Sequence, residues 1–230
     1  MKNKILAVVA HPDDEVLGPG GALLKHAQAG DEVYCLILGQ GAMARTGARL
    51  AAVKALRQVA KKAGKILGLK KMFFADFPDN RFDSVSLLDI TKKVEEYLER
   101  LKPEIIYTHY GDDLNIDHRL AFQAVLTACR PCNENCPKEI YAFETLSSSE
   151  WQEPALAFQP NYFVDISDVF GKKTEALKAY ASEIRPYPHP RSVEGLKILA
   201  QWRGLQSGLR LAEAFCQVRK INVVTGRDNV

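Results

Sequence analysis

The segment Val8–Glu15 reads VVAHPDDE, and in it a run of aliphatic residues changes abruptly into a histidine, a proline and three carboxylates. The aliphatic part belongs to an apolar run over residues 5–9, which predicts a buried strand. The charged part has two interpretations. Asp13 and Asp14 could stabilise the amino end of a helix, because carboxylates there complement the helix dipole. Alternatively, the histidine and the carboxylates could form a chemical site at the end of the strand.

Outside this segment, short aliphatic runs alternate with longer helical patterns, which is typical of βαβ units and an α/β fold with a mostly parallel sheet. Gly30 and Gly68 follow two predicted helices, as is common just past a helix end, and Pro131 should terminate another. The expected strands are residues 5–9, 33–38, 71–74, 104–108, 139–144, 161–166 and 212–218. The expected helices are residues 15–29, 48–67, 87–101, 168–180 and 193–209, and a further one that ends before Pro131.

The composition excludes several classes of protein. The chain has 230 residues, of which 47% are hydrophobic and 26% charged, as in one globular domain of moderate size. Its 31 basic and 28 acidic residues are spread along the chain, so we expect no nucleic-acid partner. The first apolar run is short and is followed by acidic residues, unlike a signal peptide, and no stretch approaches the roughly 20 apolar residues of a membrane span. We therefore expect a soluble, cytoplasmic protein.

The five cysteines argue against a disulfide framework, because their number is odd and no secretory signal precedes them. Three of them form the cluster Cys129-x2-Cys132-x3-Cys136. A structural zinc site needs four ligands, and no second CxxC pair supplies the remainder. We interpret the cluster as a surface loop, with a metal or redox role as the open alternative.

A second group of polar residues follows the predicted fourth strand, in the segment THYGDDLNIDH at residues 108–118. In doubly wound sheets the first strand commonly lies beside the fourth, and ligands bind at the carboxyl ends of the strands. His11, Asp14 and His118 would then meet, and two imidazoles with one carboxylate are the ligands of a catalytic zinc site. Asp13, beside them, could take a proton from the attacking water.

Two other interpretations of these residues need weighing. His118 by itself could be a surface histidine at the start of a helix. A dinucleotide site in the same place would need the pattern G-x-G-x-x-G directly after the first strand. The nearest glycines, Gly18, Gly20 and Gly21, have a different spacing and follow an acidic loop that would repel a pyrophosphate. A metal site is therefore the favoured hypothesis.

The motifs AHPDDE after the first strand, Gly20-Gly21 and Asp117-His118 resemble the PIG-L/LmbE-like family of zinc-dependent N-deacetylases. The resemblance implies a Rossmann-like three-layer sandwich in one domain over residues 1–230. Its core would cover about residues 1–130, and a C-terminal extension over about residues 138–230 would complete the sheet and the rim of the substrate site. It also implies hydrolysis of an N-acetyl group, usually on an amino sugar such as an N-acetylglucosamine derivative.

The resemblance also assigns roles residue by residue. His11, Asp14 and His118 match the metal ligands of the family and Asp13 matches its general base, in agreement with the ligand chemistry above. The cofactor would be Zn²⁺ or another divalent metal, and the partner an N-acetyl sugar or glycoconjugate. The sequence leaves a homo-oligomer open.

Asn115 departs from the family pattern. Many members have His-Pro-Asp-His where this chain has Asn-Ile-Asp-His at residues 115–118, and that first histidine is assigned to the oxyanion. An amide can still donate a hydrogen bond to developing negative charge, but it cannot protonate the leaving amine as an imidazolium can. Either Asp13 performs both proton transfers or another group, such as His189, assists. Asp117 is expected to orient the site by contacting a ligand histidine, with a helix cap as the alternative.

Three predicted loops carry polar groups that a sugar would need. The expected substrate contacts are Arg45, Arg49, Asp79, Arg81, His189 and Arg191. Two other functions stay open. The protein could bind a metal or a carbohydrate without catalysis, or it could hydrolyse a phosphoester, although phosphoesterases tend to use two metals and this chain offers ligands for one.

Overall fold

The computed structural model describes residues 2–41, 50–132 and 135–222, and these contain one seven-stranded sheet. The strands are β1 (Lys4–Val9), β2 (Glu32–Gly39), β3 (Lys71–Phe77), β4 (Ile105–His109), β5 (Glu139–Phe143), β6 (Tyr162–Asp165) and β7 (Ala212–Lys220). They lie in the order β3-β2-β1-β4-β5-β7-β6. The first five in this order are parallel, and β7 is antiparallel to both of its neighbours.

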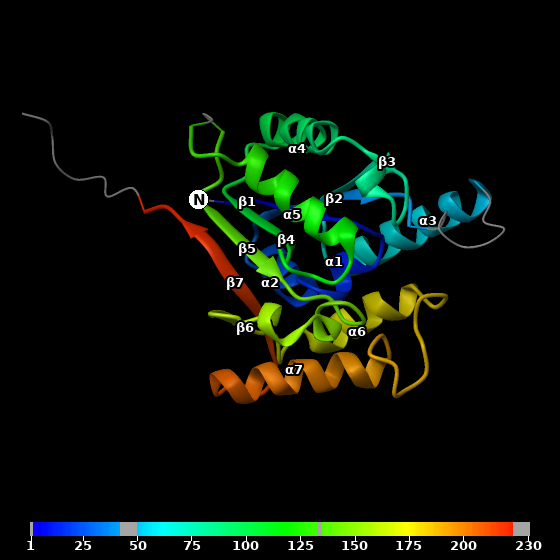
Figure 1. Cartoon of the computed structure of the whole chain (residues 1–230). Helices are drawn as coiled ribbons and strands as arrows, with labels where there is room; N and C mark the ends of the chain where they lie inside the picture. Colours follow the sequence, from blue (N-terminus) through cyan, green and yellow to red (C-terminus); the bar gives the residue numbers. More distant parts are fainter. Residues whose placement is uncertain (1, 42–49, 133–134, 223–230) are drawn as a thin grey trace, which may run out of the picture.

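Helices cover both faces of the sheet, which gives the three layers seen in Figure 1. The helices are α1 (Asp14–Leu17), α2 (Gly20–Gln28), α3 (Leu50–Ile66), α4 (Leu87–Leu101), α5 (Ile116–Ala128), α6 (Phe170–Ala179) and α7 (Val193–Ser207), with short 3-10 helices η1 (Phe82–Ser84), η2 (Ser149–Trp151) and η3 (Pro154–Leu156). Alternate residues of β1 point to opposite faces. Ile5, Ala7 and Val9 pack with the layer that contains α2, α3, α6 and α7, whereas Leu6 and Val8 pack with α4 and α5. The predicted α/β sandwich with a mostly parallel sheet is confirmed.

The expected elements are found with small shifts at their ends, with one exception. The predicted helix over residues 15–29 is wrong, because the structure has two helices there, separated at Gly18 and Pro19. Pro19 lacks an N–H and disfavours the helical conformation in the residue before it. Gly18 also lies against Phe143, where an added Cβ would approach the ring to 2.2 Å. Any larger residue at position 18 would therefore collide with Phe143 in the observed backbone.

A buried ion pair from the C-terminal part of the chain satisfies the backbone groups at this break. Lys173 of α6 donates to the carbonyl oxygens of Leu17 (3.2 Å) and Gly18 (3.0 Å) and pairs with Glu213 of β7. The Glu213 carboxylate accepts hydrogen bonds from the backbone N–H groups of Gly21 (2.6 Å) and Ala22 (2.8 Å). The end of α1 and the start of α2 are therefore held by side chains that lie far away in the sequence.

The three cysteines of the cluster lie in different environments. Cys129 is buried, Cys132 is exposed and Cys136 is partly buried, with its thiol donating to the carbonyl oxygen of Cys129 (3.2 Å). Residues 133–134 lie outside the described part of the chain. Within that part, the side-chain groups that could hold a metal include none of these cysteines. The described helices also include none that is long and apolar enough to cross a bilayer.

The topology brings the two charged loops together. β1 pairs with β4 in parallel, with Ile5 opposite Ile105 and Ala7 opposite Tyr107, as expected for the first and fourth strands. The loop after β1 and the loop after β4 therefore leave the same edge of the sheet. The start of η1 joins them there, because Phe82 donates its backbone N–H to Asp117 (2.9 Å).

Candidate metal centre and active site

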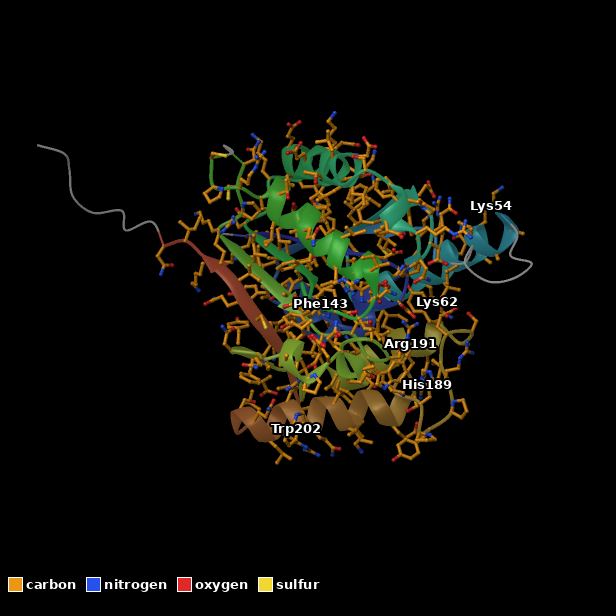
Figure 2. All side chains as sticks on the ribbon, in the orientation of Figure 1. Lys54, Lys62, Phe143, His189, Arg191 and Trp202 are labelled. Atoms are coloured by element: carbon orange, nitrogen blue, oxygen red, sulfur yellow. The ribbon has the colours of Figure 1, made fainter. Side chains whose placement is uncertain are left out.

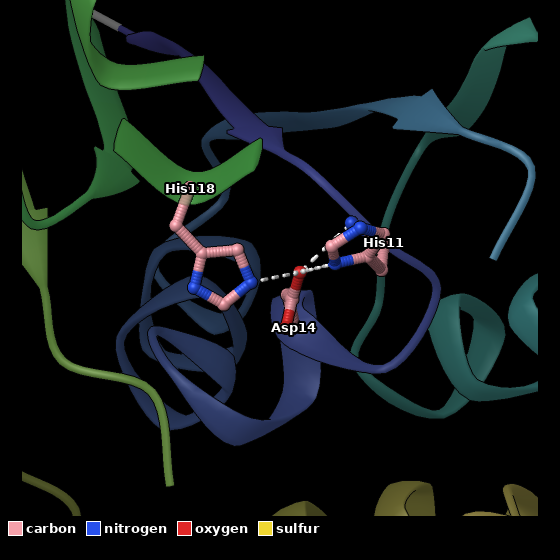
Figure 3. A group of neighbouring side chains, drawn as sticks. All are labelled: His11, Asp14 and His118. Atoms are coloured by element: carbon pink, nitrogen blue, oxygen red, sulfur yellow. Dashed lines mark hydrogen bonds and ion pairs between the residues drawn. The ribbon is translucent and has the colours of Figure 1, made fainter. Parts of the chain in front are cut away.

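His11, Asp14 and His118 form a compact, buried cluster (Figure 3). His11 follows β1, Asp14 begins α1 and His118 lies in the first turn of α5. One ligand atom from each lies within 4.8 Å of the other two. The structure thus brings together the three side chains that the sequence predicts as metal ligands.

His11 is held by two carboxylates, Asp117 at one ring nitrogen and Asp14 at its backbone N–H and near the other ring nitrogen. Its Nε2 lies 2.9 Å from the Asp117 carboxylate, and its backbone N–H donates to Asp14 Oδ2 (2.8 Å). The other ring nitrogen, Nδ1, lies 3.5 Å from Asp14 Oδ2. Asp117 is itself fixed by the backbone N–H of Phe82. This arrangement leaves Nδ1 of His11 as the nitrogen that faces the centre of the cluster.

His118 has the opposite orientation. Its Nδ1 lies 3.0 Å from Asp113, a buried carboxylate that also accepts hydrogen bonds from the hydroxyls of Ser148 and Ser149. Its Nε2 points toward Asp14 Oδ2 at 3.5 Å and has no hydrogen-bond partner. A carboxylate on one ring nitrogen is the usual way in which proteins orient a metal-binding histidine.

The unpartnered atoms of the cluster fit a divalent cation. Buried polar atoms normally have a hydrogen-bond partner, yet His118 Nε2 and Asp14 Oδ1 have none. Two imidazoles and one carboxylate match a catalytic zinc site. A second group, His11, Asp79 and Asp117, also has metal-ligand spacing, but it shares His11 with the first. In the second group the ring nitrogen near Asp117 already has a hydrogen-bond partner, so the first group fits better.

The charges of the cluster also favour a cation. Burial lowers the pKa of His11, but Asp117 and Asp14 outweigh this effect and raise the pKa to about 10. Burial raises the pKa of Asp14, but the neighbouring histidines outweigh it and hold the pKa well below its ordinary value. Burial also raises the pKa of Asp113, but the contact with His118 outweighs this effect and lowers the pKa to about 2. The site is therefore built to hold positive charge, which either a proton or a metal ion supplies.

Asp13 lies next to this cluster in an unusual backbone conformation, with φ 104° and ψ −26°. Its Oδ2 is paired with Arg191 at 2.9 Å, whereas its buried Oδ1 has no partner. Burial raises the pKa of Asp13 well above its ordinary value, although the Arg191 guanidinium opposes the shift. A carboxylate with one fixed oxygen, one unpartnered oxygen and a raised pKa has the properties of a general base.

Asn115 is the cap of α5, and Asp117 is not. The Asn115 Oδ1 accepts the backbone N–H of Asp117 (2.9 Å), and its Nδ2 donates to Asn80 Oδ1 (3.1 Å). Asn115 and Asn80 both line the cavity described below. Asp117 instead uses its carboxylate to contact His11, as expected for a residue that orients the site.

A polar cavity of about 140 Å³ opens beside Asp13. Of the residues expected to contact substrate, Asp79 and Arg191 line it. Asp79 lies 3.5 Å from His11, and Arg191 bonds to Ser147 (2.7 Å) as well as to Asp13.

The other expected substrate contacts are placed differently. Arg81 is exposed and does not line the cavity. His189 lies in the segment before α7 (Figure 2). Its ring is nearly perpendicular to that of Trp151, with centroids 6.3 Å apart, and it does not line the cavity. Its Nδ1 accepts the backbone N–H of Arg191 (3.1 Å), so it contacts the site through Arg191. Arg45 and Arg49 lie outside the described residues.

Sequence reasoning missed His109, the last residue of β4. Its ring stacks on His118 with centroids 3.9 Å apart, and its Nε2 accepts the backbone N–H of Ala10 (2.9 Å). Burial and the charge of His118 lower its pKa to about 4, which keeps the ring neutral and suits this acceptor role. Asp113 and Glu15 were also missed. All three are buried polar residues in the two motifs, and only their contacts distinguish them from capping or strand residues.

Comparison with known proteins finds a matching family model and similar proteins. Residues 6–129 match the family model described as PIG-L, GlcNAc-PI de-N-acetylase. The chain is 30% identical over 228 residues to the diacetylchitobiose deacetylase of Thermococcus kodakarensis, which covers 92% of this chain and 82% of that protein. It is also 31% identical over 198 residues to the 4-oxalmesaconate hydratase of Pseudomonas putida, which covers 77% of this chain and 73% of that protein.

The fold is similar to solved structures as well. The N,N'-diacetylchitobiose deacetylase from Pyrococcus horikoshii superimposes with a TM-score of 0.75 at 23% identity, over 97% of this chain and 88% of that chain. This likeness confirms the three-layer fold.

Proposed function

The chain belongs to the PIG-L family, the GlcNAc-PI de-N-acetylases, and from this membership and its site we propose that it is a metal-dependent N-deacetylase of N-acetylated amino sugars or their conjugates. The observation that carries the proposal is the buried cluster of His11, Asp14 and His118. Two of its ligand atoms lack partners, and Asp13 lies beside it with an unpartnered oxygen. A sugar-binding surface alone would not need such a cluster.

The metal would be held by Nδ1 of His11, by Asp14 and by Nε2 of His118, and we expect zinc. When bound, the ion would polarise the acetamide carbonyl and favour ionisation of the attacking water. Asp117 and Asp113 support this set, because each bonds to the ring nitrogen that does not face the cluster. Neither carboxylate is needed as a ligand in this proposal.

Asp13 would perform the proton transfers. As the water oxygen bonds to the acetamide carbon, Oδ1 of Asp13 would accept one water proton. It would then deliver that proton to the departing nitrogen as the C–N bond breaks, leaving acetic acid and the free amine. The Arg191 contact holds Oδ2, so the same oxygen would act in both transfers. His189 lies outside the cavity lining, which favours Asp13 for both transfers.

Asn115 would stabilise the oxyanion. Its amide nitrogen carries two hydrogens, of which Asn80 accepts one. The other can donate to the carbonyl oxygen of a substrate in the cavity, where a donor of this kind typically contributes about 10²–10³-fold to the rate. Asp79 and Arg191 would contact the sugar from the cavity wall.

Hydration of an unsaturated carboxylate is the second candidate function. It is favoured by the similarity to the Pseudomonas putida hydratase, which lies at the same level of identity as the deacetylase. A cation and a general base that activate water would serve either reaction. The substrate distinguishes the two, since only a deacetylase releases acetate.

The test is acetate release by the zinc-loaded protein from free N-acetylglucosamine, N,N'-diacetylchitobiose, and nucleotide- and lipid-linked N-acetyl sugars. Consumption of 4-oxalmesaconate is measured in parallel. We expect acetate from at least one sugar, and a loss of about 10²–10⁴-fold in Asp13→Asn. Full activity in Asp13→Asn would disprove the assignment of the base. Hydration without acetate release would support the second function, and stoichiometric zinc without either reaction would indicate a binding protein.

A further inference from the structure

Glu15 is a third buried carboxylate in the segment AHPDDE, and the mechanism above gives it no task. Its exposed fraction is 0%. Its Oε2 accepts the backbone N–H of Asp13 (3.0 Å), and its Oε1 accepts the hydroxyl of Tyr180 (2.5 Å), which lies at the end of α6. Both carboxylate oxygens thus have a defined donor, one of them the backbone of the general base.

The backbone of Asp13 needs such support. At φ 104° the residue lies in a region that L-amino acids rarely adopt, and a conformation of this kind costs about 1–3 kcal/mol unless the surroundings hold it. On its carbonyl side, the N–H groups of Val16 and Leu17 donate to the Asp13 oxygen (2.9 Å each) as the first bonds of α1. On its amide side, the contact that the structure shows is the one to Glu15.

Tyr180 connects this contact to the C-terminal part of the chain. Its exposed fraction is 0%, and its hydroxyl donates to Oε1 of Glu15. The Asp13 amide donates to the other carboxylate oxygen, Oε2. Arg191, from the same part of the chain, holds the Asp13 side chain. The backbone and the side chain of the base are therefore held by two separate contacts, one through Glu15 and one direct.

We infer that Glu15 and Tyr180 are positioning residues that set the orientation of Asp13 through hydrogen bonds, and that Glu15 acts as an acceptor for the Asp13 amide. The effects on kcat that follow from this inference rest on the proposed function. It does not require Glu15 to bind metal or to exchange protons with substrate.

Two substitutions of Glu15 separate hydrogen bonding from charge. In Glu15→Gln the amide oxygen can still accept the Asp13 N–H, while the amide N–H₂ can donate to the Tyr180 oxygen, so we expect kcat within about 3-fold of wild type. Glu15→Leu keeps the bulk and loses both bonds. A small displacement of a catalytic group can cost about 10²-fold, so we expect kcat to fall by about that factor, with KM and the zinc content unchanged.

Tyr180→Phe removes the second hydrogen bond and keeps the ring. We expect a smaller fall in kcat than in Glu15→Leu, again without a change in KM. Tyr97→Phe, at a buried tyrosine of α4 that packs against Phe73, is the matched control and should leave kcat unchanged. Zinc content and the unfolding temperature are measured for each variant, so that loss of fold or of metal is not mistaken for misplacement.

Hydrogen exchange of the Asp13 amide tests the inference without activity. It should be slow in wild type and in Glu15→Gln and faster in Glu15→Leu. If Glu15→Gln loses as much kcat as Glu15→Leu, or if Glu15→Leu loses zinc, the acceptor role is overturned. It is also overturned if Asp13 exchanges equally slowly in all forms. A wild-type protein that releases no acetate would contradict the proposed function alone, because the exchange measurement would still decide the role of Glu15.

Discussion

His11 and His118 each have one ring nitrogen fixed by a carboxylate, and this fixes which nitrogen is available to a metal. Asp113 holds Nδ1 of His118 and is itself held by the hydroxyls of Ser148 and Ser149. Such supporting carboxylates raise the basicity of the ligand and fix its ring, and their loss typically lowers metal affinity by about 10–100-fold.

We therefore expect Asp113→Asn to weaken zinc binding by about 10–100-fold, since the amide is uncharged and a weaker acceptor. Competition with a chromogenic chelator measures the dissociation constant. Asp112→Asn, at the exposed neighbouring carboxylate, is the control and should bind zinc like wild type. Equal affinities for all three proteins would show that Asp113 does not support the ligand.

Asn115 combines two tasks that substitutions can separate. Its Oδ1 caps α5, and its Nδ2, which donates to Asn80, is the proposed donor to the oxyanion. Asn115→Ser keeps a capping oxygen but loses the amide donor, whereas Asn115→Ala loses both. Because a cap contributes about 1 kcal/mol, we expect only the alanine variant to lose about that much free energy of unfolding in urea.

Both Asn115 variants should lose kcat to a similar extent, by about 10²-fold, if the amide stabilises the oxyanion. Steady-state kinetics on the best sugar substrate check this. Because a serine hydroxyl can still donate a hydrogen bond, the alanine variant decides the role: if it keeps full kcat, Asn115 is only a helix cap and another group stabilises the oxyanion.

At the scale of the elements, the break between α1 and α2 places Asp14, a proposed metal ligand, in a short helix of its own. The break needs Gly18, because a Cβ there would approach the Phe143 ring to 2.2 Å. We expect Gly18→Ala to destabilise the protein by about 1–3 kcal/mol, as overpacking usually does.

The double variant Gly18→Ala/Phe143→Leu tests this explanation, because a smaller side chain on β5 gives the added methyl group room. Gly18→Ala should therefore cost less free energy of unfolding in the Phe143→Leu background than it costs in wild type. If the cost is the same in both backgrounds, the contact with Phe143 is not the cause, and the backbone conformation of the break is.

The elements also show what a sequence can predict. The strands were predictable because short continuous aliphatic runs bounded by polar residues indicate buried strands. The parallel order of β1 and β4 then brings His11, Asp14 and His118 together. The break at Gly18 was not predicted, although residues 18–21, Gly-Pro-Gly-Gly, interrupt the apolar pattern of residues 15–29. A proline inside a helical pattern commonly ends or kinks the helix, so the sequence did contain a signal for the break.

Tertiary contacts that leave no local pattern explain the other misses. His109 looks like any polar residue at a strand end until its ring is seen stacked on His118. The partner of Glu15, Tyr180, lies 165 positions away. Nothing in the spacing of the motif indicates such a contact.

At the scale of the whole molecule, the C-terminal part of the chain supports the first loop of the site at several points. Lys173 and Glu213 hold the break between α1 and α2, and Tyr180 and Arg191 hold Glu15 and Asp13. Removing one partner of a buried ion pair leaves an uncompensated charge, which typically costs about 3–5 kcal/mol.

We accordingly expect Lys173→Met to lower the free energy of unfolding by about 3–5 kcal/mol, because Glu213 is then buried without its cation. Urea unfolding measures the loss. In Lys173→Met/Glu213→Gln the remaining amide can still accept from the α2 backbone without carrying a charge, so part of the stability should return. A double variant less stable than Lys173→Met would show that the charge of Glu213 is not the source of the loss.

The two histidines of the cluster lie about a hundred positions apart in the chain, on loops that meet only when β1 and β4 have paired. An unfolded chain does not hold them together, so a metal ion would bind the folded state in preference to the unfolded state. By mass action, free metal at about 100 times its dissociation constant would stabilise the fold by about 2.7 kcal/mol. The cofactor of the proposed reaction would then also stabilise the folded state, and the free energy of unfolding would depend on the concentration of free metal.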